Sequence, residues 1–193
     1  YTKTSIDNPS ELYLLQAGKE LAITDFNSSW LNQKSLSKAE RHTYVNKLGQ
    51  TIDYWVMKPA GFVAGQKYPL VVEIHGGPTA MWGTGEASMW HEFQYYASKG
   101  LGVVYGNPRG SGGYGTNFLA ANVKDWGAGP MADIMQMTDL SINEGWVDTT
   151  QLAVTGGSYA GYLVTWMLGH TNRFKVACSQ RGVYELSTFF GEG

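Results

Sequence analysis

The chain has 193 residues, of which 43% are hydrophobic, and it includes 7 Trp, 12 Tyr and 7 Phe. A chain of this length and composition can bury a sizeable core, which excludes an intrinsically disordered protein. The 14 Lys and Arg residues are balanced by 16 Asp and Glu, giving a net charge of −2. Nucleic acid and anionic membrane surfaces are therefore not expected as partners, because the chain has no basic field to hold them.

The sequence shows no signal for membrane insertion or export. No apolar run approaches the ~18 residues that span a bilayer, and the first residues lack a charged, then apolar, then small-residue pattern. The single cysteine, Cys178, lies in an apolar run and cannot form an internal disulfide, so we expect a buried structural thiol. These features predict a cytoplasmic protein. Because the first residue is Tyr1 rather than Met, we expect a fragment of a longer protein.

Residues 1–25 predict a β-hairpin. Two short apolar runs, 12–15 and 21–24, are separated by the sequence Ala-Gly-Lys-Glu, which is typical of two strands joined by a turn. Two strands alone are marginal in water, so this hairpin needs a neighbour to pair with. Residues 26–50 begin with a stretch rich in Asn, Ser and Lys, which we interpret as a linker and the entry into the next domain.

From residue 51 the pattern alternates between strands and helices. Apolar runs that predict strands lie at 54–57, 70–74, 101–105, 152–155 and 174–178. Apolar residues at helical spacing predict helices at 86–99, 130–143 and 159–168, the last of them ended by Gly169 as a left-handed cap. Because several strands are apolar on both faces, the sequence predicts an α/β fold with a mostly parallel sheet.

The segment 152–162, LAVTGGSYAGY, carries the strongest chemical signal. An apolar strand leads through two glycines to Ser158, and an amphipathic helix follows at once. A serine on so sharp a turn takes a strained backbone that lifts its hydroxyl clear of the sheet, where it can act as a nucleophile. The amide of Tyr159 would then point toward a developing oxyanion. The G-x-S-x-G pattern expects glycine where this chain has Ala160, followed by Gly161.

A second element, PLVVEIHGGP at 69–78, is a buried strand that leads into a glycine loop. In α/β-hydrolases the loop after this strand supplies the other oxyanion N–H, which we assign to Gly77. His75 could be a general base, but a histidine at the end of a buried strand more often orients its loop. We favour that structural role for His75.

Three motifs, HGGP at 75–78, NPRGSGGYG at 107–115 and GGSYAGY at 156–162, occur in this order. With them the chain resembles the prolyl oligopeptidase family of serine peptidases, in particular its acylaminoacyl-peptidase-like branch. The resemblance implies an α/β-hydrolase domain, here incomplete, with helices on both faces of its sheet and a β-propeller before it. It makes residues 1–25 a remnant of the last propeller blade and residues 51–193 the first part of the catalytic domain.

The resemblance also implies an activity and its residues. Family members cut short peptides through a serine nucleophile and an acyl-enzyme, without metal or cofactor. Ser158 is then the nucleophile, Tyr159 and Gly77 provide the oxyanion N–H groups, and Tyr184 with Phe189 line the pocket for the residue before the cut. Arg109 resembles a structural loop anchor. A homo-oligomer of the longer protein is left open.

The partners of a catalytic triad are missing from the sequence after Ser158. They follow the serine in the order Asp or Glu, then His. The 35 residues after Ser158 contain no Asp; their acids are Glu185 and Glu192, and their one histidine is His170. At ~1.5 Å per helical residue, His170 lies roughly 18 Å from the serine, far beyond reach of its proton. We therefore expect the chain alone to be nearly inactive.

Three alternative functions compete with this interpretation. Residues 110–115 match G-x-G-x-x-G, the dinucleotide-binding fingerprint, but no helix opens directly from a strand end there and a lone match is weak. A carboxylesterase would use the same serine and oxyanion donors, because the fold does not choose between ester and peptide. A non-catalytic domain that has lost its triad is the third alternative.

Overall fold

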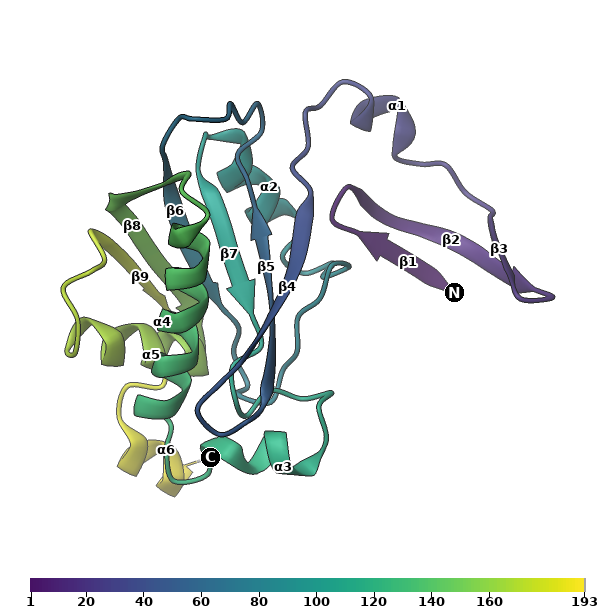
Figure 1. Cartoon of the computed structure of the whole chain (residues 1–193). Helices are drawn as coiled ribbons and strands as arrows, with labels where there is room; N and C mark the ends of the chain where they lie inside the picture. The colour runs from purple at the N-terminus through teal and green to yellow at the C-terminus, as the bar shows by residue number, and fades with distance from the viewer. Residues whose placement is uncertain (193) are drawn as a thin grey trace.

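The computed structural model describes residues 1–192, which form two sheets (Figure 1). The smaller sheet is antiparallel and consists of β1 (Thr2–Ser5), β2 (Asn8–Gln16) and β3 (Lys19–Ala22). Strands β2 and β3 form the predicted hairpin, with Gln16 opposite Lys19. Ala17 and Gly18 both take positive φ, 50° and 75°, as the tight turn between twisted strands requires.

The turn between β1 and β2 packs against the larger part of the molecule. Ile6 is buried among Trp55, Phe93 and Tyr105, and the Gln94 side chain donates to the Ile6 carbonyl at 2.6 Å. Gln94 also donates to the Ser37 carbonyl and accepts from the Ser37 amide. One buried amide side chain therefore connects three separate segments.

The larger sheet has six strands in the order β4-β5-β7-β6-β8-β9. In chain order, these strands are β4 (Ala39–Val45), β5 (Thr51–Met57), β6 (Tyr68–Ile74), β7 (Gly102–Gly106), β8 (Val147–Gly157) and β9 (Val176–Gln180). Three of the five pairings are parallel, whereas β4–β5 and β5–β7 are antiparallel. The mostly parallel α/β sheet is thus confirmed, and β4 lies in the stretch assigned to the linker and domain entry.

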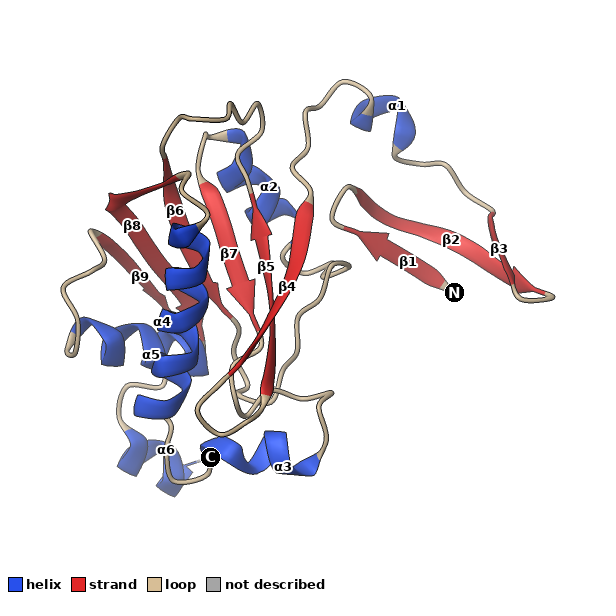
Figure 2. Cartoon of the chain, viewed as in Figure 1, coloured by secondary structure: helices blue, strands red, loops and turns tan. Residues whose placement is uncertain are grey.

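Helices cover both faces of this sheet (Figure 2). On one face α2 (Trp90–Ser98) buries Phe93 and Ala97, and on the other α4 (Ala128–Asn143) and α5 (Tyr159–Leu168) form the larger core. The shorter helices are α1 (Ser28–Leu31), α3 (Thr116–Leu119), η1 (Ala120–Asn122) and α6 (Leu186–Glu192). Among residues 1–192, no helix is long and apolar enough to cross a bilayer.

Two local predictions are wrong. Gly169 ends α5 with φ −77° rather than in the left-handed conformation, because the amides of Gly169, His170 and Thr171 turn back onto the last carbonyls of the helix. Cys178 is exposed rather than buried. Its neighbour Ala177 packs on the α5 side, so Cys178 points to the opposite face, because side chains alternate along a strand.

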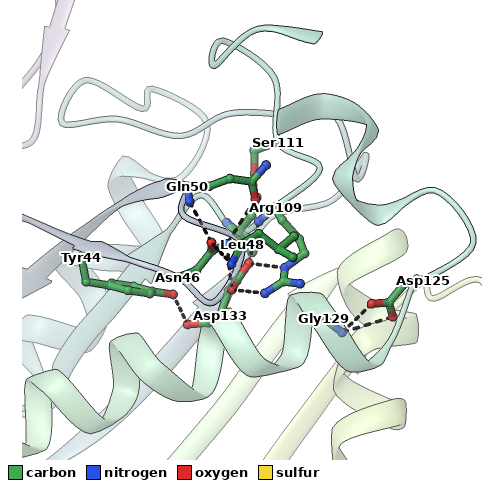
Figure 3. A network of polar contacts seen from close by, with 10 residues as sticks. Tyr44, Asn46, Leu48, Gln50, Arg109, Ser111, Asp125, Gly129 and Asp133 are labelled. Carbon is green, nitrogen blue, oxygen red and sulfur yellow. Dashed lines mark hydrogen bonds and ion pairs between the residues drawn. The ribbon is translucent and has the colours of Figure 1, made fainter. Parts of the chain in front are cut away.

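A buried ion pair fixes the loop that follows β7 (Figure 3). Arg109 donates from Nε and one terminal nitrogen to both carboxylate oxygens of Asp133, at 2.8 and 2.7 Å, and its amide donates to the same group. The Tyr44 hydroxyl and the Asn46 side chain also donate to Asp133. Nearby, Asp125 accepts from the Gly129 amide in the first turn of α4. Arg109 is therefore the loop anchor that the sequence predicts.

Removing one member of this pair tests how much the fold depends on it. We expect Asp133→Ala to lower the free energy of unfolding by about 3–5 kcal/mol, because it leaves the Arg109 guanidinium buried without a counter-charge. Asp139 on the same helix pairs with Arg173 at 2.6 Å, but its side chain is 54% exposed. Asp139→Ala should therefore cost less than about 1 kcal/mol. Urea denaturation of both variants makes the comparison, and similar losses would contradict it.

Candidate active site

Ser158 stands at the junction of β8 and α5 in a strained conformation. Its φ is 62° and its ψ is −123°, a region that costs an L-residue on the order of 1–3 kcal/mol. The side chain is exposed, and its hydroxyl does not cap its own helix. The backbone strain and the free hydroxyl that the sequence predicts at this turn are confirmed.

The glycines around Ser158 are required by close contacts. A Cβ on Gly156 would lie 2.6 Å from the Ala160 methyl and 2.7 Å from the Ile74 carbonyl oxygen. A Cβ on Gly161 would lie 2.7 Å from the Cα of Gly182. Ala160 fits because Gly156 gives it room, and Gly161 lets the first turn of α5 lie against Gln180 and Gly182. The departure from G-x-S-x-G at Ala160 therefore leaves the turn intact.

The Tyr159 amide lies at the first position of α5, where an N–H has no intrahelical acceptor. Within residues 1–192 it donates to no other group. The Tyr159 side chain is buried and its hydroxyl donates to the Trp126 carbonyl at 2.8 Å. Burial raises the pKa of this phenol above its ordinary value. Its side chain thus anchors the start of α5 and leaves the backbone amide free.

The glycine loop after β6 lies directly against the serine turn. A Cβ on Gly76 would lie 2.9 Å from the Gly157 carbonyl oxygen and 3.3 Å from the Ser158 Cβ. The next residue, Gly77, has φ 116°, and a Cβ there would lie 2.2 Å from the Thr79 amide nitrogen. The structure therefore brings the loop of Gly77 against the turn that carries Ser158 and Tyr159.

His75 orients this loop, as predicted. It is 2% exposed, with Nδ1 2.8 Å from the Gly76 carbonyl and Nε2 2.9 Å from the Ser111 hydroxyl. Ser111 in turn donates to the Pro108 carbonyl, one residue before Arg109. Burial lowers the pKa of the His75 imidazole. Both ring nitrogens are engaged by the loops, so His75 is not available to accept the Ser158 proton.

The glycines at 110–115 serve close packing between loops. A Cβ on Gly110 would lie 2.4 Å from the Asn122 side chain, and one on Gly113 would lie 2.3 Å from the Met81 sulfur. Protein atoms therefore occupy the space that a pyrophosphate would need in a dinucleotide-binding loop.

Within residues 1–192, no histidine is hydrogen-bonded to Ser158. His170 is exposed beyond the end of α5, stacks on Trp166 at 4.3 Å and contacts the Trp166 carbonyl through Nδ1. His42 lies on β4 beside Glu144. Of the same residues, no group of three or more His, Cys, Asp or Glu could hold a metal ion.

The two predicted pocket residues occupy different places. Phe189 on α6 lines an aromatic groove of about 830 Å³ together with Trp126, Tyr162, Trp166 and Phe190. Tyr184 is exposed in the turn after β9, with its hydroxyl 3.0 Å from that of Ser179. Ser158 does not line the groove. The structure thus brings the loop of Gly76 and Gly77 against the turn that carries Ser158 and Tyr159, and places Tyr184 and Phe189 outside this group.

A small cavity beside Ser158 contains two acidic residues that the sequence analysis missed. The cavity has a volume of about 160 Å³, and Glu73 on β6 and Glu92 on α2 both line it with Ser158. Glu73 is 1% exposed. Burial, and then the charge of Glu92, raise the pKa of the Glu73 carboxyl well above its ordinary value. A glutamate inside the apolar run PLVVEI is the signal that could have identified it.

The raised pKa of Glu73 predicts a pH-dependent stability. The unfolded chain ionises this carboxyl as the pH rises above its ordinary pKa, whereas the folded chain keeps it neutral, so the wild type loses stability toward alkaline pH. Glu73→Gln should match the wild type near about pH 4.5 and exceed its free energy of unfolding by about 1 kcal/mol or more at about pH 8. Urea denaturation at both pH values measures the difference, with Glu40→Gln on β4 as control. A constant difference would contradict the prediction.

The comparisons with known proteins agree with this geometry. The profile of the prolyl oligopeptidase family matches residues 87–192, more than half of the chain. The chain belongs to this family. It is 40% identical over 190 residues to the uncharacterized peptidase YuxL of Bacillus subtilis, covering 97% of this chain and 28% of YuxL. It is 29% identical over 194 residues to dipeptidyl-peptidase 5 of Schizosaccharomyces pombe, covering 98% of this chain and 26% of that protein.

Solved structures give the same result. The acylaminoacyl peptidase of Pyrococcus horikoshii superposes with a TM-score of 0.90 at 30% identity, over 99% of this chain and 30% of that one. A Mycobacterium tuberculosis puromycin-hydrolyzing peptidase superposes with a TM-score of 0.85 at 26% identity, over 100% of this chain and 30% of its own. The mixed sheet is thus part of an α/β-hydrolase fold, and the chain spans 30% or less of the length of these relatives.

Proposed function

We propose that Ser158 is the nucleophile of a serine peptidase that hydrolyses short peptides. Its oxygen attacks the scissile carbonyl, and the resulting oxyanion accepts hydrogen bonds from the Tyr159 and Gly77 amides. The amine leaves with a proton, an acyl-enzyme forms on Ser158, and water releases the acid and restores the hydroxyl. The observation that carries the proposal is the strained, exposed Ser158 with its unshared hydroxyl, held against the Gly76–Gly77 loop.

The proposed reaction also needs a base and an acid. A serine without a base is a poor nucleophile, because its proton has no acceptor in the transition state. Within residues 1–192 no histidine contacts Ser158. We therefore propose that these groups come from other residues of the working enzyme, and that residues 1–193 alone turn over substrate only weakly.

The names of the relatives support peptides as substrates. They are a dipeptidyl-peptidase and an acylaminoacyl peptidase, and one solved relative is complexed with a chloromethyl ketone of Z-Gly-Gly-Phe. The proposal extends to Tyr184 and Phe189 as side chains near the residue before the cut, and to β1–β3 as the end of a β-propeller. Hydrolysis of peptide anilides compared with p-nitrophenyl esters, on a protein that includes the base, distinguishes a peptidase from a carboxylesterase.

Labelling with a fluorophosphonate probe tests the nucleophile. We expect residues 1–193 to be labelled slowly at a single site, because the oxyanion donors are present without a base. Ser158→Ala should reduce labelling to background, whereas Ser187→Ala on the exposed face of α6 should leave it unchanged. Intact-protein mass spectrometry gives the rate and the stoichiometry. Rapid stoichiometric labelling would show that a base exists within these residues, and labelling of Ser158→Ala would overturn the proposal.

The oxyanion loop can be tested in the same assay. Gly77→Ala places a Cβ within 2.2 Å of the Thr79 amide nitrogen at a positive φ, so the loop must move. The N–H of residue 77 then no longer points at the proposed oxyanion position. We expect the labelling rate to fall about 10²-fold, as for the loss of one oxyanion donor. Gly83 in the same loop has no atom within 4 Å of an added Cβ, so Gly83→Ala is the matched control. Thermal unfolding of both variants separates a moved loop from an unfolded chain.

A further inference from the structure

One oxygen of the Glu73 carboxyl is buried without a hydrogen-bond partner. Its Oε1 atom is inaccessible to solvent and forms no hydrogen bond among residues 1–192. Burial raises the pKa of Glu73, and its acidic neighbour Glu92, in the first turn of α2, raises this pKa further through its charge and a side-chain hydrogen bond. Glu92 also accepts a hydrogen bond from the Tyr96 hydroxyl at 3.2 Å. Buried polar groups without partners are rare in native structures, because each costs the full free energy of desolvation. This pair therefore calls for an explanation.

No cation of the described chain neutralises the pair. Arg181 lines the same cavity, but its guanidinium lies against Gly157, and one of its nitrogens donates to the Gln180 side chain at 3.3 Å. Among residues 1–192 it forms no ion pair with either glutamate. The acidic end of the cavity is thus left for a group that enters it.

The residues that line the cavity favour an alkylammonium group as its ligand. Trp82 and Met89 contribute apolar surface beside the two glutamates. Among residues 1–192 no group of three or more His, Cys, Asp or Glu could hold a metal ion, whereas an apolar wall that ends in acidic groups suits an alkyl stem with an ammonium head. A volume of about 160 Å³ is smaller than the roughly 300–1,000 Å³ of a pocket for a whole ligand, so it suits one side chain.

We propose that this cavity is a subsite for a lysine-type side chain of the substrate, held by Glu73 and Glu92; this rests on the proposed peptidase function. Ser158, Gly76 and Gly157 line the same cavity, so the bound side chain belongs to a residue next to the scissile bond. When the ammonium enters, the neutral Glu73 carboxyl releases its proton to solvent and pairs as a carboxylate. The enzyme therefore prefers peptides with a basic residue at that position.

Calorimetric titration of the whole chain with n-butylammonium chloride tests the subsite. We expect one site per chain and release of a proton, measured as a binding enthalpy that changes with the ionisation enthalpy of the buffer. The neutral isostere 1-butanol should not bind. Glu73→Gln and Glu92→Gln should each weaken binding by about tenfold or more, equivalent to about 1.4 kcal/mol. Glu40→Gln, on the far edge strand, should bind as the wild type does. Circular dichroism establishes that each variant is folded. If Glu73→Gln does not fold, Glu92→Gln alone tests the contribution of the acidic pair to binding.

Several results would overturn the subsite. These are no butylammonium binding to the wild type, equal binding of 1-butanol, binding without proton release, and unchanged affinity in both glutamine variants. The titration is repeated on Ser158→Ala, in which no acyl-enzyme can form. If Ser158→Ala binds butylammonium but the wild type is never labelled by the fluorophosphonate, the peptidase proposal fails and the cation site stands. The reverse result leaves the peptidase and removes the subsite.

Discussion

The backbone of Ser158 is held where a free chain would not place it, and the surrounding fold provides the restraint. The parallel ladder between β6 and β8 sets Ile74 beside Gly156, which brings the glycine loop and the serine turn to the same edge of the sheet. The Ser158 amide donates to the Gln180 carbonyl at 3.1 Å, so β9 also restrains the turn. Strain of on the order of 1–3 kcal/mol persists only where neighbouring elements determine the conformation in this way.

A second restraint reaches the site from the far side of the loop after β7. Asp133 on α4 holds Arg109, the loop continues to Ser111, and Ser111 contacts the His75 ring that holds Gly76. The Arg109–Asp133 and His75–Ser111 links are buried, so water does not compete with them. An ion pair on one face of the sheet thereby restrains the glycine loop beside the nucleophile. This explains why the NPRG motif belongs to the site although Arg109 contacts no reacting atom.

Local sequence patterns were enough to predict the serine turn, the first hairpin and the central strands. These features depend on neighbouring residues: glycines beside Ser158, Ala17-Gly18 between two apolar runs, and continuous apolar strands. Strand β4 was missed because its side chains are mostly exposed, so its pairing with β5 left little apolar pattern. The exposure of Cys178 depends on which face of an edge strand is covered, which no local pattern records.

The Glu73–Glu92 pair is a second feature that no local sequence pattern could predict. The two residues lie on different elements, a strand and a helix, and only the packing of α2 on the sheet brings them to one cavity. Glu73 is an acidic residue in the middle of a buried strand whose neighbouring positions in β6 are apolar. Native sequences break such local rules chiefly at functional sites and accept a loss of stability there. Since an apolar residue would fill this position at lower cost, the carboxyl beside Ser158 is best explained by a charge that it binds.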